Sequence, residues 1–210
     1  MFDGLTTWVT DVIDALGYPG VAFLVALESV FPPIPSEVVL PLSGFVAGRG
    51  DASLVGMIVA ATVGSVVGAL VLYGLAAWIG RDRLHRFVGR WGRWFQVKPN
   101  DLERAEAWFD RRALAAVLLG RCVPLIRSVV SVPAGFRRMP LLRFTAATAA
   151  GSLVWNVALI GAGALLGDRW ETVGDYVGIL QWLVIVSIAA LAVWFLGRRL
   201  GRRFTAGSPE

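Results

Sequence analysis

The chain has 210 residues, 56% of them hydrophobic, with a mean hydropathy of +0.66 and a formal net charge of +5. Its apolar residues come in long blocks, which excludes an ordinary soluble domain and indicates a polytopic membrane protein with a single domain. The basic excess lies beside these blocks, where it favours a role in membrane topology over nucleic-acid binding. Because Cys122 is the only cysteine, an intramolecular disulfide and a multi-cysteine metal site are excluded. We expect neither a metal nor a cofactor.

The first predicted elements are a surface helix and a broken apolar run. Residues 2–16 carry apolar side chains at helical spacing, which predicts a helix in the membrane interface, ended by a break at 17–20. The apolar run that follows holds Pro32, Pro33 and Pro35 in its middle, and an α-helix cannot pass through them. The two limbs, at 20–31 and 36–48, are each about 18–20 Å long, against a hydrocarbon core of about 30 Å. Residues 17–48 are therefore predicted to form a re-entrant hairpin.

The pattern of a hairpin followed by a full span occurs twice. Residues 54–79 predict a membrane span whose Gly64 and Gly68 form a small-residue face for helix packing. Residues 81–112 predict a basic loop and surface helix, with binding of anionic lipids as the alternative. A second re-entrant hairpin is expected at 113–135, broken at Pro124 and leaving at Pro133 and Gly135. Further spans are expected at 141–166 and 176–197, before a basic tail at 198–210.

The arginines predict the orientation of the chain. Sixteen of the twenty Lys and Arg residues lie in 81–112, 137–143 and the tail, which places these segments and the C-terminus in the cytoplasm and the N-terminus outside. The first hairpin then enters from outside and the second from inside. This arrangement is an inverted repeat of hairpin plus span. Broken segments at matching positions of inverted halves indicate a transporter with its site near the bilayer midplane.

Four charged residues fall inside apolar runs: Glu28, Glu37, Arg121 and Arg127. An ionised group at mid-depth costs about 2.5–3.5 kcal/mol, so the two acids and two arginines are expected to converge where the hairpin tips meet. Two buried salt bridges with a purely structural role are one interpretation. The other divides the roles: arginine cannot be neutralised and suits phosphate oxygens, whereas a buried glutamate can take up a proton. It predicts that Arg121 and Arg127 bind an anionic headgroup while Glu28 and Glu37 couple this binding to protonation.

Two motifs resemble a known family. ESVFPPIPSE at 28–37 looks like the signature of the DedA family of bacterial membrane proteins, which is related to the SNARE-associated or VTT domain. GRCVPLIR at 120–127, followed by Pro133-Ala134-Gly135, resembles the family's second signature, and Gly151 and Trp155 also fit. A third, looser pattern matches at Gly68, Tyr73 and Gly80, although Ala69 stands where many members carry Asp and residues 76–77 are Ala-Ala where many carry Gly-Arg. The resemblance covers about residues 17–197.

The resemblance implies a lipid transporter of the bacterial plasma membrane rather than an enzyme, most closely one that moves undecaprenyl phosphate or another phospholipid. It also attributes the family's function to the positions of the four buried charges. The expected partners are a lipid with an anionic phosphate headgroup and protons or another coupling cation. A homo-oligomer is allowed, and nucleic acid is not expected. Three alternatives stay open: an intramembrane polyprenyl-diphosphate phosphatase, for which Ser128 and Ser131 are available nucleophiles, a small-ion or proton antiporter, and a structural protein.

Overall fold

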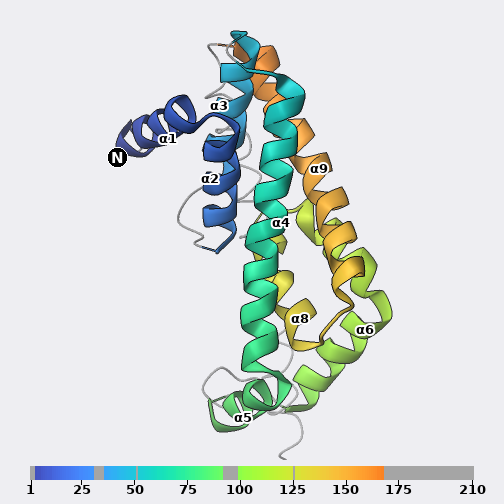
Figure 1. Cartoon of the computed structure of the whole chain (residues 1–210). Helices are drawn as coiled ribbons and strands as arrows, with labels where there is room; N and C mark the ends of the chain where they lie inside the picture. The colour runs from blue at the N-terminus through green and yellow to red at the C-terminus, as the bar shows by residue number, and fades with distance from the viewer. Residues whose placement is uncertain (1–2, 31–35, 51, 92–98, 125, 168–210) are drawn as a thin grey trace, which may run out of the picture. The chain divides into compact units, whose positions relative to one another are not determined.

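A computed structural model of the chain describes residues 3–30, 36–50, 52–91, 99–124 and 126–167, all within one compact unit, Met1–Gly174. The described residues are helical and contain no strand. Figure 1 shows the helices in chain order: α1 (Asp3–Leu16), α2 (Tyr18–Val30), α3 (Ser36–Gly48), α4 (Leu54–Ile79), α5 (Arg81–Trp91), α6 (Pro99–Arg121), α7 (Ile126–Val129), α8 (Ser131–Phe136) and α9 (Leu141–Leu166). The predicted span at 176–197, the tail and the prolines at 32, 33 and 35 lie outside the described residues.

The two longest apolar helices, α4 and α9, begin and end where the sequence predicts. Each has 26 residues and is long and apolar enough to cross a membrane. The hydroxyl of Ser53 caps α4 by accepting a hydrogen bond from the backbone N–H of Gly56 at 3.4 Å. Both helices end at a glycine with positive φ, 78° at Gly80 and 52° at Gly167. The outer face of α4 is a row of exposed valines and a leucine, spaced four residues apart: Val55, Val59, Val63, Val67, Val71 and Leu75.

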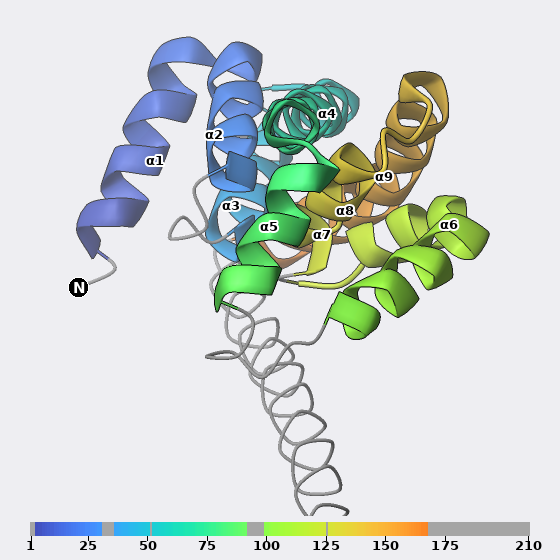
Figure 2. The ribbon, with the colours of Figure 1, turned by 90° about the horizontal axis from the view of Figure 1, so that it is seen from below.

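Each long helix packs mainly against two of the shorter helices. Helices α2 and α8 contact α4, whereas α3 and α6 contact α9. The predicted small-residue face on α4 serves this packing: a Cβ added at Gly64 would lie 2.2 Å from the carbonyl oxygen of Ala22 on α2. Figures 1 and 2 show α8 between α4 and α6. The side chain of Tyr73 joins α4 to the link between α8 and α9, since its hydroxyl donates to the carbonyl of Met139 at 2.7 Å.

The structure differs from the sequence-based expectation at the start of the first apolar run. The chain breaks at Gly17 alone, which has φ of 59°, and α2 begins at Tyr18. Pro19 therefore sits in the first turn of the helix, where its missing N–H has no intrahelical partner to lose. The basic surface helix and the apolar limb after residue 112 both lie within α6, and they meet at a kink. A non-helical residue, Arg112 (φ −132°, ψ 19°), marks the expected boundary as a kink.

Candidate functional site

Glu28 and Arg127, which lie 99 residues apart in the sequence, form an ion pair in the interior. Glu28 lies in the last turn of α2, and its side chain has no solvent exposure. Arg127 comes from the short helix α7, and its side chain is 12% exposed. Its Nη2 donates to Oε1 of Glu28. A charge-assisted bond of this kind is strong where water is excluded.

Arg121 lies beside this pair, in the last position of α6. It is 3% exposed, and its Nη2 donates to the hydroxyl of Ser131, on α8, at 2.6 Å. Its Nε is buried and has no hydrogen-bond partner among the described residues. The guanidinium groups of Arg121 and Arg127 are close enough to repel each other electrostatically. The described part of the cluster thus contains two guanidinium groups and one carboxylate.

The turn between α6 and α7 sets the directions of both arginines. The backbone N–H groups of Cys122 and Val123 donate to the carbonyls three residues back, at 3.0 and 3.2 Å, so the helix tightens as it ends. Pro124, which is buried and has no N–H, lies in this turn. Arg127 then enters α7 with its own N–H bonded to the carbonyl of Val123 at 3.1 Å. Arg121 and Arg127 therefore flank one turn that contains a proline.

Pro133 and Gly135 lie in α8, directly behind the arginine turn. A Cβ added at Gly135 would lie 2.3 Å from the carbonyl oxygen of Tyr73, so only glycine allows α8 to approach α4 this closely. Pro133 sits in the first turn of α8, where a proline is tolerated. This close approach holds α8, and with it Ser131, the partner of Arg121, against α4.

The remaining predicted site residues fall outside the described side chains. Glu37 lies in the first turn of α3, but its side chain is not described, and Pro32, Pro33 and Pro35 lie between α2 and α3. The structure therefore brings together Glu28, Arg121 and Arg127. Within the described residues, no group of three or more His, Cys, Asp or Glu side chains is placed to hold a metal ion.

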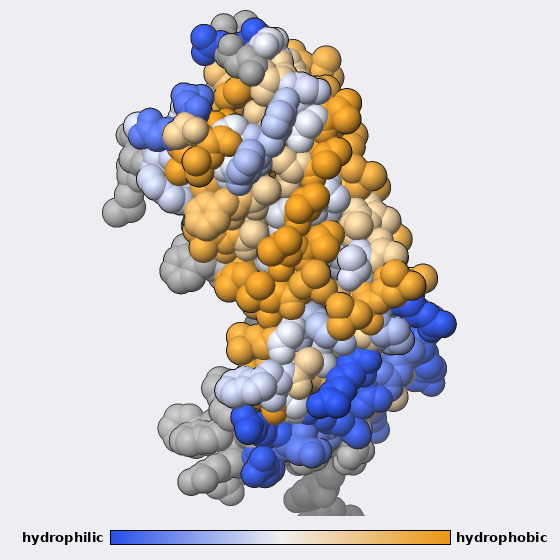
Figure 3. Space-filling view, viewed as in Figure 1, coloured by the Kyte–Doolittle hydropathy of each residue, from blue (hydrophilic) through white to orange (hydrophobic). Residues whose placement is uncertain are grey.

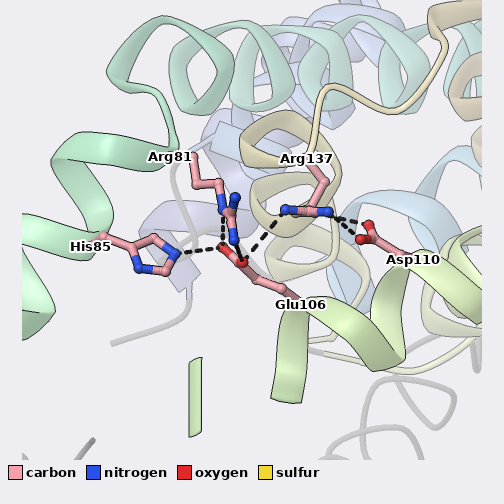
Figure 4. A network of polar contacts seen from close by, with 5 residues as sticks. All are labelled: Arg81, His85, Glu106, Asp110 and Arg137. Carbon is pink, nitrogen blue, oxygen red and sulfur yellow. Dashed lines mark hydrogen bonds and ion pairs between the residues drawn. The ribbon is translucent and has the colours of Figure 1, made fainter. Parts of the chain in front are cut away.

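A second polar cluster, which sequence reasoning missed, joins α5, α6 and the residue that follows α8 (Figure 4). We call it the charged network: Arg81, His85, Glu106, Asp110 and Arg137. At its centre is Glu106 on α6. Glu106 accepts hydrogen bonds from Arg81 at 2.7 to 3.2 Å and from Arg137 at 3.4 Å, and its Oε1 lies 3.1 Å from Nε2 of His85.

Two pairs in the sequence carry the signal for this network. Residues 81 and 85, and residues 106 and 110, are each four apart, which places each pair on one helix face. Arg137, just after α8, lies between the two faces and also donates to Asp110. Spacing alone could not show that the two faces meet, because that depends on how α5 packs against α6.

The network shifts the protonation of its members. Burial raises the pKa of Glu106, but hydrogen bonds and charge attraction from Arg81 and His85 outweigh burial, so that the pKa lies below its ordinary value of 4.5. The hydrogen bond from Arg137 to Asp110 raises the pKa of Arg137. Both residues are thus held in their charged forms, as expected of a structural ion-pair network.

The chain is similar to known membrane proteins. The family model described as the VTT domain matches residues 34–165. A Lactococcus lactis subsp. cremoris protein named alkaline phosphatase-like protein is 45% identical over 90% of this chain and 87% of its own length. The Staphylococcus aureus protein named undecaprenyl phosphate transporter A is 32% identical, covering 91% of this chain and 96% of the relative. Its Bacillus subtilis namesake is 28% identical over 91% of both chains. No solved structure was found to match.

Proposed function

Because the chain belongs to the DedA family of VTT-domain membrane proteins, we propose that it moves a lipid with an anionic phosphate headgroup between the leaflets of the bacterial plasma membrane. Undecaprenyl phosphate is the substrate that the names of the transporter relatives favour. The observation that carries the proposal is the buried pair of Glu28 and Arg127 beside the buried Arg121. A buried ion pair stabilises a fold poorly compared with apolar packing, so a purely structural role would explain it poorly.

The packing of the helices supports the inverted repeat that such a transporter needs. In this proposal α2 and α3 form the outer re-entrant hairpin, while the apolar part of α6, with α7 and α8, forms the inner one. Exchanging α2 with α6, α3 with α8, and α4 with α9 turns two of the main packing pairs into two others: α2 on α4 becomes α6 on α9, and α3 on α9 becomes α8 on α4. Two inverted halves that share their long helices would hold a site where their broken segments meet.

The chemistry of the cluster suggests how loading and protonation are coupled. A phosphate headgroup that binds the guanidinium groups of Arg121 and Arg127 competes with Glu28 for Arg127. Once displaced, the carboxylate of Glu28 is buried without its cation, so it takes up a proton, alone or shared with Glu37. When the headgroup leaves, the proton is released and the ion pair forms again. Transport would then depend on pH or on the proton-motive force.

The distribution of arginines gives the proposed orientation of the chain in the membrane. The charged network lies where α4 ends and just before α9 begins, and we assign this basic end to the cytoplasm. The C-terminus is then cytoplasmic and the N-terminus lies outside, with α1 in the membrane interface. The whole chain, residues 1–210, acts in this proposal as one membrane domain that crosses the bilayer several times.

Reconstitution tests the proposal. Liposomes carry polyprenyl phosphate in one leaflet, with and without a pH gradient, and the transfer of lipid to the other leaflet is measured. We expect the wild type to move the lipid, Arg127→Ala to lose transfer, and the exposed-residue control Arg104→Ala to retain it. Equal transfer by wild type and Arg127→Ala would overturn the proposal. Two further readings separate the alternatives: proton flux that needs no lipid indicates a small-ion antiporter, and phosphate release from polyprenyl diphosphate indicates a phosphatase.

A further inference from the structure

A groove with a strongly basic lining lies at the same end of the molecule as the charged network. It has a volume of about 530 Å³ and is bounded by residues 109–115 of α6 and by the segment that links α8 to the start of α9. Five arginines and one aspartate line it: Arg111, Arg112, Arg137, Arg138, Arg143 and Asp110. In Figure 3 a hydrophilic surface over α6 adjoins a broad hydrophobic band. The groove thus combines concentrated positive charge with a position at the edge of the apolar surface.

The charges in the groove are not balanced within the described structure. Asp110, its only acid, is already bound to Arg137. Arg111, Arg112, Arg138 and Arg143 are exposed, and none of them makes an ion pair with a described residue. Four like charges around one hollow repel one another, and an anion in the groove would remove that repulsion. The groove is therefore complementary to a ligand with more than one negatively charged oxygen.

The backbone directs two of these arginines through unusual conformations. Arg112 is the kink of α6, and Arg138 is the one described non-glycine residue with positive φ, 48°. Arg143 is in the first turn of α9. The three guanidinium groups thus reach the groove from three separate segments. A planar guanidinium matches phosphate oxygens in a bidentate manner, and several of them from different directions suit a phosphate group.

The apolar surroundings indicate that the phosphate belongs to a lipid. Leu114 lines the groove and is 54% exposed, while Leu141 and Leu142, next to its edge, are 58% and 82% exposed. Exposed leucines can contact the acyl chains of a lipid, whereas a site for a soluble anion needs no apolar residues at its edge. Basic pockets at the cytoplasmic ends of membrane helices bind lipid headgroups through this combination.

We propose that this groove is a docking site for the phosphate headgroup of an anionic lipid in the cytoplasmic leaflet, separate from the buried Arg121 and Arg127 cluster. It rests on the proposed function, because it would hold the headgroup of the same class of lipid where that lipid arrives at or leaves the basic end of the transporter. The groove would raise the local concentration of the substrate without taking part in its passage through the interior.

Native mass spectrometry of the purified full chain in detergent tests this site, with dioleoyl phosphatidic acid as the probe. The groove variant is Arg112→Gln/Arg143→Gln, and the matched control Arg86→Gln/Arg104→Gln removes the same charge from exposed arginines that do not line the groove. Since an arginine near an anionic surface contributes about fivefold to binding, we expect the groove variant to bind roughly 10- to 30-fold more weakly. The control should stay within about twofold of wild type. Unchanged circular dichroism would show that both variants fold.

Three outcomes would overturn the groove site. One is wild-type binding by the groove variant, and another is an equal loss in the control variant. The third is competition by millimolar inorganic phosphate as effective as competition by the lipid, which would assign the groove to a soluble anion. Arg127→Ala distinguishes this proposal from the proposed function. If it transports lipid normally, the proposed function fails; if Arg112→Gln/Arg143→Gln binds lipid normally, the groove fails.

Discussion

The molecule contains two clusters of charged side chains that differ in how completely they are paired. In the charged network Glu106 contacts three basic side chains, those of Arg81, His85 and Arg137, and the last of these also binds Asp110. In the buried cluster the guanidinium of Arg121 donates, among the described residues, to the neutral hydroxyl of Ser131, and Arg127 pairs with Glu28. The cluster nearer to water is thus the better paired, although the buried cluster has the greater need of partners.

This difference suggests different purposes. A network whose charges are satisfied by one another fixes the elements that carry it, here α5, α6 and the end of α8. A buried guanidinium whose Nε lacks a partner among the described residues retains donors for something else. We therefore expect changes in the charged network to affect stability first, and changes in the buried cluster to affect transport even where stability is preserved.

The largest expected effect comes from removing one member of the buried pair. Arg127→Ala leaves Glu28 without its cation in a site without solvent exposure, which costs about 3–5 kcal/mol in comparable buried pairs. We expect a correspondingly lower free energy of unfolding, measured by denaturant titration in a fixed detergent. A loss below about 1 kcal/mol would mean that the pair is hydrated and that the buried cluster is not dry.

Removing both members separates stability from transport. In Glu28→Gln/Arg127→Gln neither side chain carries a charge, so the free energy of unfolding should return to within about 1 kcal/mol of wild type. Transfer of polyprenyl phosphate should nevertheless fall by about 100-fold, because a phosphate loses a charge-assisted partner that contributes 2–5 kcal/mol when buried. Liposome transfer measured beside the stability of the same preparation makes the comparison. Normal transfer by this variant would assign the pair a structural role.

The buried cluster was largely predictable from the sequence, and the charged network was not. Glu28, Arg121 and Arg127 are conspicuous because a charge inside an apolar run is costly unless it is paired or hydrated, whatever the fold. Arg81, Glu106 and Arg137 lie beside other charged residues, and the pairs four residues apart place the first two on helix faces without showing that these faces meet. Their meeting depends on the kink of α6 at Arg112 and on the packing of α5, neither of which follows from local spacing.

The helices show the same division. The bounds of α4, α3 and α9 follow from proline, glycine and apolar length, which act locally. The sequence predicts a start for α2 that is too late, because Pro19 resembles a break although the first turn of a helix accepts proline. The change from the polar to the apolar half of α6 predicts a boundary at residue 112, and the kink at Arg112 lies there.

A smaller effect is expected from the centre of the charged network. Glu106→Ala leaves Arg81 and Arg137 facing each other without the carboxylate that both contact, so we expect a loss of about 2 kcal/mol in the free energy of unfolding. Lipid transfer per folded molecule should stay near wild type, because the partners of Glu106 are Arg81, His85 and Arg137, which do not belong to the buried cluster. A loss of transfer as large as that of the buried variants would end the distinction between the clusters.

The smallest expected effect is the pH dependence of this network. The pKa of Glu106 is lowered on folding, so its ionised form stabilises the folded state fully above its ordinary value of 4.5, and this contribution is lost as the pH falls below that value toward the lowered pKa. The groups facing Glu106 are Arg81 and His85 from one side and Arg137 from the other, with Asp110 behind Arg137. Other carboxylates titrate in the same range, so the informative quantity is the difference between wild type and Glu106→Gln. The stability advantage of wild type should shrink from pH 6 to pH 3; an advantage that stays constant would show that Glu106 is not held ionised by its neighbours.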